Sequence, residues 1–309
     1  MKTVFIDGSA GTTGLRIRER LAARADISLL TLPEDLRKDT AARREALNAA
    51  DIAFLCLPDA AAVEAVSLIE NPLTAVIDTS TAHRTNPAWV YGMPELAGKR
   101  AKIAASKRIA NPGCHASGFI ALVAPLVAAG VLSPDAALTA FSLTGYSGGG
   151  KNMIAAYGDA ARDALLDAPR QYGLSQSHKH LPEMQALCGL TILPLFSPIV
   201  ADYYAGMEVT VPLFRAQVKG GVDAIRTVYR EIYGEGMIRF AEDDGEGGFL
   251  SASAFAGRDD MEVRVLGNEE RILLISRFDN LGKGASGAAI QNMNILLGVP
   301  ENTGLVTGE

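Results

Sequence analysis

Cysteine is scarce in this chain of 309 residues, which holds three: Cys56, Cys114 and Cys188. They are odd in number and far apart, a distribution that fits neither a disulfide framework nor a set of metal ligands. Proteins of the reducing cytosol use cysteine in this way. The sequence therefore predicts a cytoplasmic protein that holds no metal.

Long apolar runs and clusters of basic residues are also missing. The longest apolar segment, residues 119–132, contains Pro125 and Gly130 and is shorter than the roughly 20 residues of a membrane span. The N-terminal apolar run, residues 4–6, is too short for a signal peptide. The formal net charge of -6 comes without the clustered Lys and Arg that a nucleic-acid surface needs. We therefore expect no membrane and no nucleic acid among the partners.

The composition is that of an ordinary soluble globular protein, 48% hydrophobic and 21% charged, and the length allows two domains. In the first third, short β-rich runs alternate with helical patterns, as in a parallel sheet covered by helices on both faces. These runs are residues 3–6, 27–32, 52–57, 75–77 and 107–110.

The pattern changes after the middle of the chain. Strand-like runs separated by long excursions, with alternating apolar residues, predict a second α+β domain whose sheet has one covered face. The runs are residues 138–143, 208–213, 261–265 and 271–278, with helical stretches at 152–166 and 222–233. Residues 285–297 predict a final helix that packs back on the first domain.

A glycine-rich turn follows the first strand-like run. Gly8, Gly11 and Gly14 are spaced as in a variant of the dinucleotide-binding fingerprint, in which small residues let the backbone approach a pyrophosphate at a helix N-terminus. A merely tight connection could use the same glycines, but the strand–helix alternation that follows favours a cofactor site. Its predicted residues are Gly8, Ser9, Ala10, Gly11, Thr12, Thr13 and Gly14.

Charged residues after the second run bear on which cofactor binds. Glu34 at a ribose 2′-hydroxyl would favour NAD, whereas Arg37 and Lys38 at a 2′-phosphate would favour NADP. We favour NADP(H); a solvated charged loop is the alternative for each of these residues.

The turn Asn111-Pro112-Gly113-Cys114 leads into the apolar segment 119–132, which reads as a buried helix. The Cys114 thiol is thus expected in the first turn of that helix. Unpaired N–H groups and the helix dipole there lower a thiol's pKa and favour a nucleophilic thiolate. The alternative is a buried structural cysteine.

A nucleophilic thiol needs a base, and two histidines two residues apart, His178 and His180, stand close to Glu183. One imidazole can take the thiol proton and later protonate an oxyanion, and we choose His180 for both roles. A zinc pair would lack the rest of its ligand set. Surface histidines on a loop are the other alternative.

Three basic residues lie at positions that are suited to binding an anion. Arg84 follows the run 75–77, at the strand end where open α/β sheets bind ligands. Lys151 and Lys283 lie in the glycine-rich loops 145–151 and 280–287. In a chain of net negative charge they indicate an anionic substrate or cofactor held between the domains. Turns with solvated lysines, and a surface salt bridge for Arg84, are the alternatives.

Together these motifs resemble the short (type 2) subgroup of N-acetyl-gamma-glutamyl-phosphate reductases, in the semialdehyde dehydrogenase superfamily. The resemblance covers nearly the whole chain, in the family's order. It departs from longer members at the cofactor turn, which here begins at Asp7. The motifs are Gly8-x-x-Gly11-x-x-Gly14, Asn111-Pro112-Gly113-Cys114, His178-x-His180-x-Pro182-Glu183, and Asp279-Asn280-Leu281-x-Lys283-Gly284-Ala285-x-Gly287 with Gln291-Asn292.

The resemblance implies an α/β fold in which a Rossmann-type parallel-sheet domain, residues 1–114 plus 283–309, binds NADP(H). It is interrupted by an α+β catalytic and dimerisation domain, residues 115–282, and the implied assembly is a homodimer or homotetramer. Small-molecule acyl phosphates are the implied substrates.

The resemblance also implies the reaction. Cys114 attacks N-acetyl-glutamyl 5-phosphate, phosphate leaves, and NADPH reduces the thioester with His180 as acid and base, giving N-acetyl-glutamate 5-semialdehyde for arginine biosynthesis. Glu183 would position the substrate or His180. The remaining predicted contacts are Arg84, Asn111 and Lys151 for the substrate and Asn280 for the cofactor.

Other functions stay open at this stage. Within the class, an aspartate-semialdehyde dehydrogenase or a reductase of an amino-adipate analogue would share the cysteine turn. A non-catalytic dinucleotide-binding regulator would keep the glycines but have no use for Cys114 and His180 together.

Overall fold

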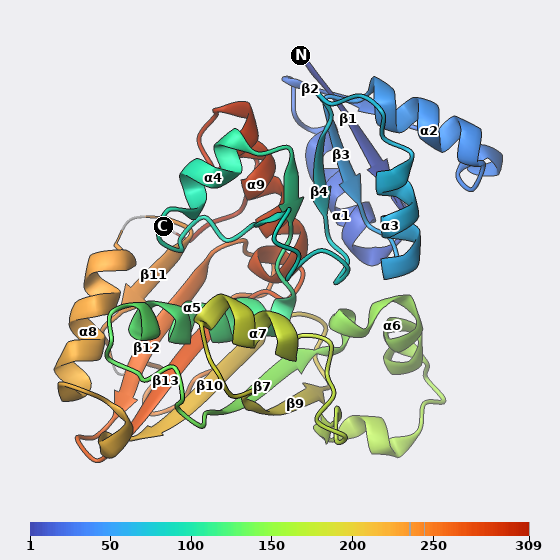
Figure 1. Ribbon diagram of the computed structural model, residues 1–309. Helices are drawn as coiled ribbons and strands as arrows, with labels where there is room; N and C mark the ends of the chain where they lie inside the picture. The colour runs from blue at the N-terminus through green and yellow to red at the C-terminus, as the bar shows by residue number, and fades with distance from the viewer. Residues whose placement is uncertain (235, 244, 309) are drawn as a thin grey trace. The chain divides into compact units, whose positions relative to one another are not determined.

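The computed structural model describes residues 1–234, 236–243 and 245–308, which form two compact units. Unit 1 comprises Met1–Pro112 and Ala285–Leu305, and unit 2 comprises Gly113–Gly284 and the residues from Val306 on. Figure 1 labels helices and strands of both units.

Unit 1 is built on a six-stranded parallel sheet in the order β2-β1-β3-β4-β6-β5. In register, Val4 of β1 pairs with Leu29 of β2 on one side and Ile52 of β3 on the other. The strands are β1 (Lys2–Asp7), β2 (Ile27–Leu30), β3 (Ile52–Leu55), β4 (Ala75–Asp78), β5 (Val90–Tyr91) and β6 (Arg108–Ala110). The predicted parallel arrangement is confirmed.

Helices cover both faces of this sheet because successive strand residues point to opposite sides. On one face Val4 and Ile77 pack with Ile17 of α1, Ile103 of α4 and Ile290 of α9. On the other, apolar side chains of α2 and α3 pack on the alternate strand residues. The helices are α1 (Thr12–Ala22), α2 (Thr40–Ala49), α3 (Asp59–Ser67), α4 (Lys99–Ala105) and α9 (Gly287–Leu297), with a short 3-10 turn at Glu34–Leu36.

The final helix packs in unit 1, as predicted: α9 contacts α1, α4 and β4. A π-helical turn, Gly282–Ser286, precedes it. Arg24, just after α1, fixes this end of the chain by donating to the Asn294 side chain and the Thr303 carbonyl, at 2.8 and 2.9 Å.

Unit 2 is built on a seven-stranded mixed sheet in the order β11-β12-β13-β10-β7-β9-β8. Pairs β7·β9 and β11·β12 are parallel and the others antiparallel. The strands are β7 (Thr139–Gly145), β8 (Arg170–Gln171), β9 (Leu195–Ala201), β10 (Met207–Phe214), β11 (Ile238–Ala241), β12 (Met261–Gly267) and β13 (Arg271–Phe278).

One face of this sheet is covered by α5 (Cys114–Ala128), which contacts β10 and β13 and is itself covered by α7 (Leu181–Cys188) and α8 (Gly221–Ile232). Along β10, buried Met207, Val209 and Val211 alternate with more exposed residues. This is the expected α+β pattern with a covered face (Figure 1).

The predicted helix over residues 152–166 is wrong in its second half. Helix α6 (Gly150–Gly158) ends at a glycine, and the Asp159 side chain then accepts the Ala161 N–H at 2.9 Å, which favours a turn. A separate 3-10 turn, Ala164–Asp167, is capped by Asp163, whose side chain accepts the Leu165 N–H.

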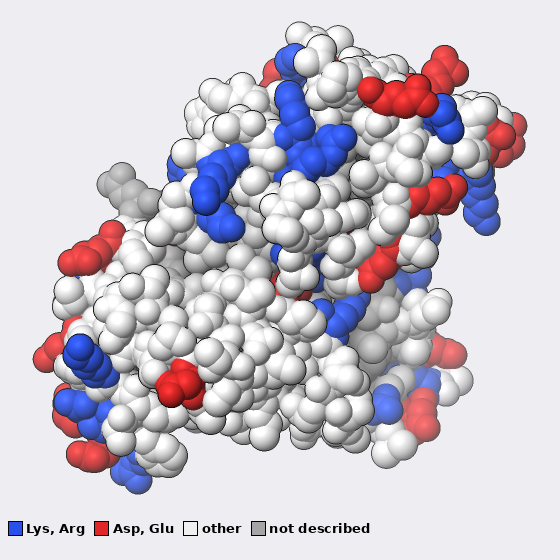
Figure 2. Space-filling model, viewed as in Figure 1, with Lys and Arg blue, Asp and Glu red and all other residues white. Residues whose placement is uncertain are grey.

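Charge is unevenly distributed on the face shown in Figure 2, where few charged side chains lie over α5 and α7 and basic ones gather over α4. Helix α5, although apolar, has 15 residues. Within the described part of the chain, no helix combines the length and apolar character needed to cross a membrane.

Candidate active site

The turn between β1 and α1 requires glycine at two positions. Gly8 has a φ of +84°, and a Cβ there would lie 2.3 Å from the Cys56 carbonyl oxygen. A Cβ on Gly14 would lie 2.5 Å from the Gly8 oxygen, which also accepts the Gly11 N–H at 3.0 Å. The backbone thus passes too close to itself and to the end of β3 for side chains.

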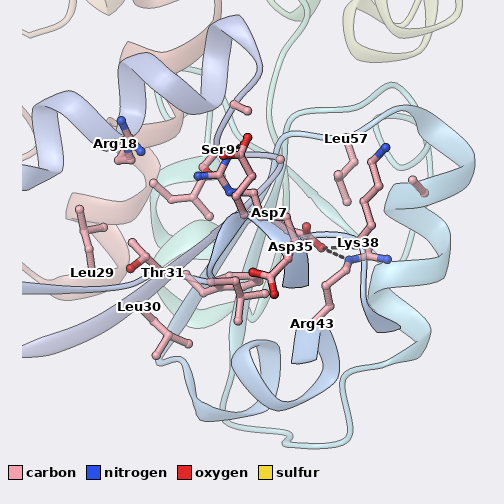
Figure 3. A pocket seen from close by; sticks show the side chains of 18 residues that line it. Asp7, Ser9, Arg18, Leu29, Leu30, Thr31, Asp35, Lys38, Arg43 and Leu57 are labelled. Carbon is pink, nitrogen blue, oxygen red and sulfur yellow. Dashed lines mark hydrogen bonds and ion pairs between the residues drawn. The ribbon is translucent and has the colours of Figure 1, made fainter. Parts of the chain in front are cut away.

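A cavity of about 690 Å³ lies beside this turn (Figure 3). Gly8, Ser9 and Ala10 form part of its wall, and Leu29 and Leu30 of β2 give it an apolar side. Its charged lining residues are Asp7, Arg18, Glu34, Asp35, Arg37, Lys38 and Arg43. An apolar wall, a bare backbone turn and several cations suit a dinucleotide with phosphate groups.

Of the predicted cofactor residues, the structure brings Gly8, Ser9 and Ala10 together with Arg37 and Lys38 in this cavity. The rest of the turn forms the start of α1 instead. Gly11 is its N-cap, and Thr12, Thr13 and Gly14 are the first helical residues.

Asn280 lies in unit 2, where its side chain is buried. Its amide donates to Ser147 Oγ at 2.9 Å, and its oxygen accepts the Gly206 N–H at 2.9 Å. These bonds hold the glycine-rich loop before α6 in place.

Arg43, which the sequence did not single out, forms a buried ion pair with Asp7 inside the same cavity (Figure 3). Its Nε and Nη2 donate to Asp7 Oδ2 at 3.0 and 2.9 Å, and Glu64 lies 3.8 Å away. Burial raises the pKa of Asp7 although Arg43 opposes the shift. The charge of Arg43 is thus engaged by protein carboxylates, whereas Lys38 is exposed.

The second site lies in unit 2 around Cys114, the first residue of α5, as predicted. Gly113 is the N-cap, and the thiol is partly exposed. Cys114 lines a cavity of about 240 Å³ together with His180, Tyr172 and His178. The structure therefore brings the two predicted catalytic residues to one pocket.

Glu183 links the cysteine turn to His180. Its Oε2 accepts the Gly113 N–H at 3.2 Å, and its Oε1 lies 4.0 Å from His180 Nε2. Both side chains are buried at the start of α7, where Pro182 occupies the first turn. One oxygen of the carboxylate contacts the cysteine turn and the other approaches the imidazole. Glu183 can therefore hold the turn and the His180 ring in a fixed relative position.

His115, the second residue of α5, is buried and bridges two hydroxyl groups. Its Nδ1 lies 2.6 Å from Ser142 Oγ of β7, and its Nε2 lies 2.6 Å from the Tyr172 hydroxyl. Burial lowers the pKa of His115 to about 3, with smaller effects from His178 and Lys179. The ring is therefore neutral near pH 7.

His178 packs edge-on against the other two rings of the pocket, with centroid distances of 4.7 Å to His180 and 5.6 Å to His115. Burial lowers the pKa of His178 to about 4. At least two of the three imidazoles are thus uncharged near neutral pH. Within the described ranges, no group of three or more His, Cys, Asp and Glu side chains is placed to hold a metal ion.

The predicted substrate residues fall in both units. In unit 1, buried Arg84 donates to the Asn111 and Thr79 carbonyls, each at 3.0 Å, and the Asn111 amide donates to the Ala285 carbonyl at 3.0 Å. In unit 2, Lys151 is exposed in the first turn of α6.

Comparison with known proteins finds a matching family for each of the two parts of the chain. The semialdehyde dehydrogenase NAD binding domain matches residues 12–105, and the semialdehyde dehydrogenase dimerisation domain matches residues 114–280. The N-acetyl-gamma-glutamyl-phosphate reductase of Burkholderia lata is 46% identical over 97% of each chain. The chain belongs to the N-acetyl-gamma-glutamyl-phosphate reductase family. A Pseudomonas putida N-acetyl-gamma-glutamyl-phosphate reductase 2 is 45% identical, with 96% of each chain covered.

Solved structures agree on the fold of this reductase-family chain. Aspartate semialdehyde dehydrogenase II of Vibrio cholerae superposes with a TM-score of 0.71 at 15% identity, over 96% of this chain and 98% of its own. The Candida albicans aspartate semialdehyde dehydrogenase with NADP gives 0.69 at 15% identity, over 98% and 100%. The family resemblance and the fold class expected from the sequence are both confirmed.

Sequence reasoning on this reductase-family chain missed His115, Tyr172 and Arg43. His115 directly follows Cys114 in the sequence, but its partner Tyr172 is 57 residues away, and Arg43 is 36 residues from Asp7. A second histidine directly after the nucleophile was the one local signal that pointed to this network.

Proposed function

We propose that this chain reduces N-acetyl-glutamyl 5-phosphate with NADPH to N-acetyl-glutamate 5-semialdehyde and phosphate, a step of arginine biosynthesis in the cytoplasm. The observation that carries the proposal is the single pocket lined by Cys114 and His180, with Glu183 between the cysteine turn and the imidazole. Relatives with nearly full coverage, named N-acetyl-gamma-glutamyl-phosphate reductase, support this substrate.

In the first step, the Cys114 sulfur attacks the acyl carbon and phosphate leaves with the electron pair of the bond that breaks. The product is a thioester on Cys114. The start of α5 supports this role because helix N-terminal N–H groups favour negative charge on sulfur and on the phosphate that leaves.

His180 is proposed as the proton carrier. It takes the thiol proton before attack and stabilises the oxygen that gains charge when the thioester is reduced. Glu183 positions this ring, which agrees with its bond to the Gly113 N–H and its 4.0 Å approach to His180. Both groups are buried, so their geometry is fixed by packing.

NADP(H) fits the cavity of unit 1. Support comes from the lining of this cavity, to which Gly8 contributes backbone without a side chain and Arg37 and Lys38 contribute the cations that a 2′-phosphate would need. When bound, NADPH supplies the hydride that reduces the thioester. The proposed contacts are Gly8, Ser9, Ala10, Gly11, Thr12, Thr13, Gly14, Arg37, Lys38 and Asn280.

Arg84, Asn111 and Lys151 are proposed as contacts of the anionic and amide groups of the substrate. Support comes from the position of Arg84 after β4, where its guanidinium is held by two backbone carbonyls, and of Lys151 at the start of α6. A guanidinium held in this way and a lysine at a helix N-terminus can each bind carboxylate or phosphate.

We propose residues 1–114 plus 283–309 as the cofactor domain and 115–282 as the catalytic and dimerisation domain. The change of compact unit at Pro112 and Ala285 supports this division, although the residues from Val306 on belong to unit 2. A homodimer or homotetramer is the proposed assembly. The matched dimerisation domain supports it, as do exposed Phe141, Leu195 and Leu273 on one face of the seven-stranded sheet.

The test is phosphate-dependent reduction of NADP by N-acetyl-glutamate semialdehyde, run beside aspartate semialdehyde. We expect turnover with the first substrate to be faster, and Cys114→Ala to abolish it while NADPH binding stays nearly unchanged. Cys188→Ala is the matched control, since Cys188 lies on α7 outside the pocket lining. Faster turnover with aspartate semialdehyde, or activity retained without Cys114, would overturn the proposal.

A further inference from the structure

A chain of three buried or half-buried groups lies beside Cys114 and has no part in the steps described above. Ser142 Oγ, the His115 ring and the Tyr172 hydroxyl are joined by two contacts of 2.6 Å. Ser142 and His115 are buried, whereas Tyr172 is half-buried and lines the cavity of Cys114.

The protons shared among Ser142, His115 and Tyr172 can be placed because His115 is neutral, its pKa being lowered to about 3 chiefly by burial. A neutral imidazole has one N–H donor and one acceptor nitrogen. Either Ser142 donates to Nδ1 and Nε2–H donates to the Tyr172 oxygen, or both bonds run in the opposite direction.

The two directions differ in what happens to the Ser142 proton. In the second, Ser142 accepts from the ring and its own buried O–H needs another acceptor, but the described part of the chain offers Ser142 no side-chain partner except His115. A buried donor left unpaired costs about 1–3 kcal/mol. The first direction is therefore preferred, and it leaves the Tyr172 proton directed away from His115.

The free Tyr172 proton has the cavity of Cys114 beside it. Burial raises the pKa of Tyr172, and charge on Cys114 raises it further, so the hydroxyl keeps its proton near neutral pH. A neutral hydroxyl whose oxygen already accepts one hydrogen bond is a directed donor.

We propose that the Tyr172 hydroxyl donates a hydrogen bond to the acyl oxygen of a group bound to Cys114, with His115 and Ser142 as positioning residues. This inference rests on the proposed function. When the Cys114 sulfur adds to the acyl carbon, the carbonyl electron pair moves to oxygen, which accepts the Tyr172 hydrogen bond. The pair returns to re-form the carbonyl as phosphate leaves, and no proton is transferred.

The experiment compares two reactions of Cys114 that need neither substrate nor cofactor. Acetylation by p-nitrophenyl acetate passes through an oxyanion, whereas alkylation by iodoacetamide does not. In Tyr172→Phe we expect acetylation to slow about 100- to 1000-fold, the range for loss of one oxyanion donor, while alkylation changes by less than about threefold. Rates in Cys114→Ala give the background from other cysteines.

Tyr229→Phe is the matched control. The Tyr229 hydroxyl donates to the Leu122 carbonyl of the same helix α5 at 2.6 Å, so its loss perturbs α5 without touching the pocket. We expect both rates to stay at the native value. Acetylation that is no faster in the native chain than in Tyr172→Phe overturns the inference, and so does equal slowing of both reactions.

A double-mutant cycle tests the positioning role of Ser142. Ser142→Ala should slow acetylation about 3- to 30-fold in the native chain and have no further effect once Tyr172 is Phe. Equal slowing in both backgrounds would show a structural effect of the substitution and would overturn the positioning role of Ser142. Absence of semialdehyde turnover in the native chain would instead count against the proposed function, and the acetylation rates would still decide this inference.

Discussion

At the scale of the residue, Gly8 shows how little space the cofactor turn leaves. Its left-handed backbone and the 2.3 Å approach of a hypothetical Cβ to the Cys56 oxygen are two separate obstacles to a side chain. The first adds strain to any other residue, and the second forces the end of β3 to move.

We therefore predict that Gly8→Ala lowers the free energy of unfolding by more than about 2 kcal/mol and weakens NADP binding about tenfold or more. Urea unfolding and calorimetric titration with NADP measure the two effects. Because the wall of the cavity moves with the turn, the two losses should occur together.

Gly98→Ala separates the effect of backbone strain from the effect of a steric clash. Gly98 also has a left-handed φ, +69°, but a Cβ there meets nothing within 4 Å. This variant should lose about 1 kcal/mol and keep native NADP affinity. Equal losses in the two variants would mean that backbone strain alone explains Gly8.

The candidate site could be predicted from the sequence where its signal is local. Cys114 precedes an apolar helix and His180 stands three residues before Glu183, and these neighbours in sequence are neighbours in space. Tyr172 could not be found in this way, because the loop that carries it reaches His115 only through the pairing of β8 with β9.

At the scale of the element, helix α5 lies unusually close to the sheet of unit 2. A Cβ on Gly118 would approach Ser276 Oγ and Val209 Cγ2 to 2.6 Å and Phe278 Cε1 to 2.8 Å. Glycine here lowers helix propensity by about 1 kcal/mol relative to alanine, so close packing must provide the compensation.

Gly118→Ala is accordingly predicted to destabilise the protein by about 1–3 kcal/mol although alanine favours a helix. Chemical denaturation gives the size of the effect. The comparison variant is Gly158→Ala at the end of α6, where a Cβ meets nothing within 4 Å. It should be neutral or slightly stabilising, and a stabilised Gly118→Ala would contradict the close packing.

Elements with strong periodicity could be predicted, and those defined by pairing could not. The apolar β3 and β4, the latter ending in Asp78, were predicted as strands and are buried along their whole length. Strand β9 was not predicted, since Pro198 lies inside it and its place in the sheet depends on parallel pairing with β7. Helix α2 was not predicted either. Its N-cap Asp39 is a start signal, but the many charged residues of the helix leave only a weak apolar pattern.

At the scale of the whole molecule, two histidines with lowered pKa values make stability depend on pH. The pKa of His115 is lowered to about 3 and that of His178 to about 4, so the folded protein stays unprotonated where the unfolded chain, with pKa values near 6.5, takes up protons. Below pH 6.5 the unfolded state therefore binds more protons, and stability falls as pH falls.

Between pH 7.5 and 5, we predict a loss of on the order of 2 kcal/mol from His115 and a smaller loss from the partly exposed His178. Urea midpoints across this range measure it. His115→Gln with His178→Gln should flatten the profile relative to the native chain. A native profile that is already flat would contradict two imidazoles that stay neutral in the folded protein.

The order in which the chain enters the two units has a consequence for its synthesis on the ribosome. The sheet of unit 1 is complete at Ala110, but the helix that covers Val4, Ile17 and Ile77, α9, is made only after all of unit 2. At about 5–20 residues per second, this face of the nascent parallel sheet is covered only by α1 and α4 for roughly ten to forty seconds. Chaperones that shield nascent apolar surface should therefore bind the N-terminal part of this chain during translation.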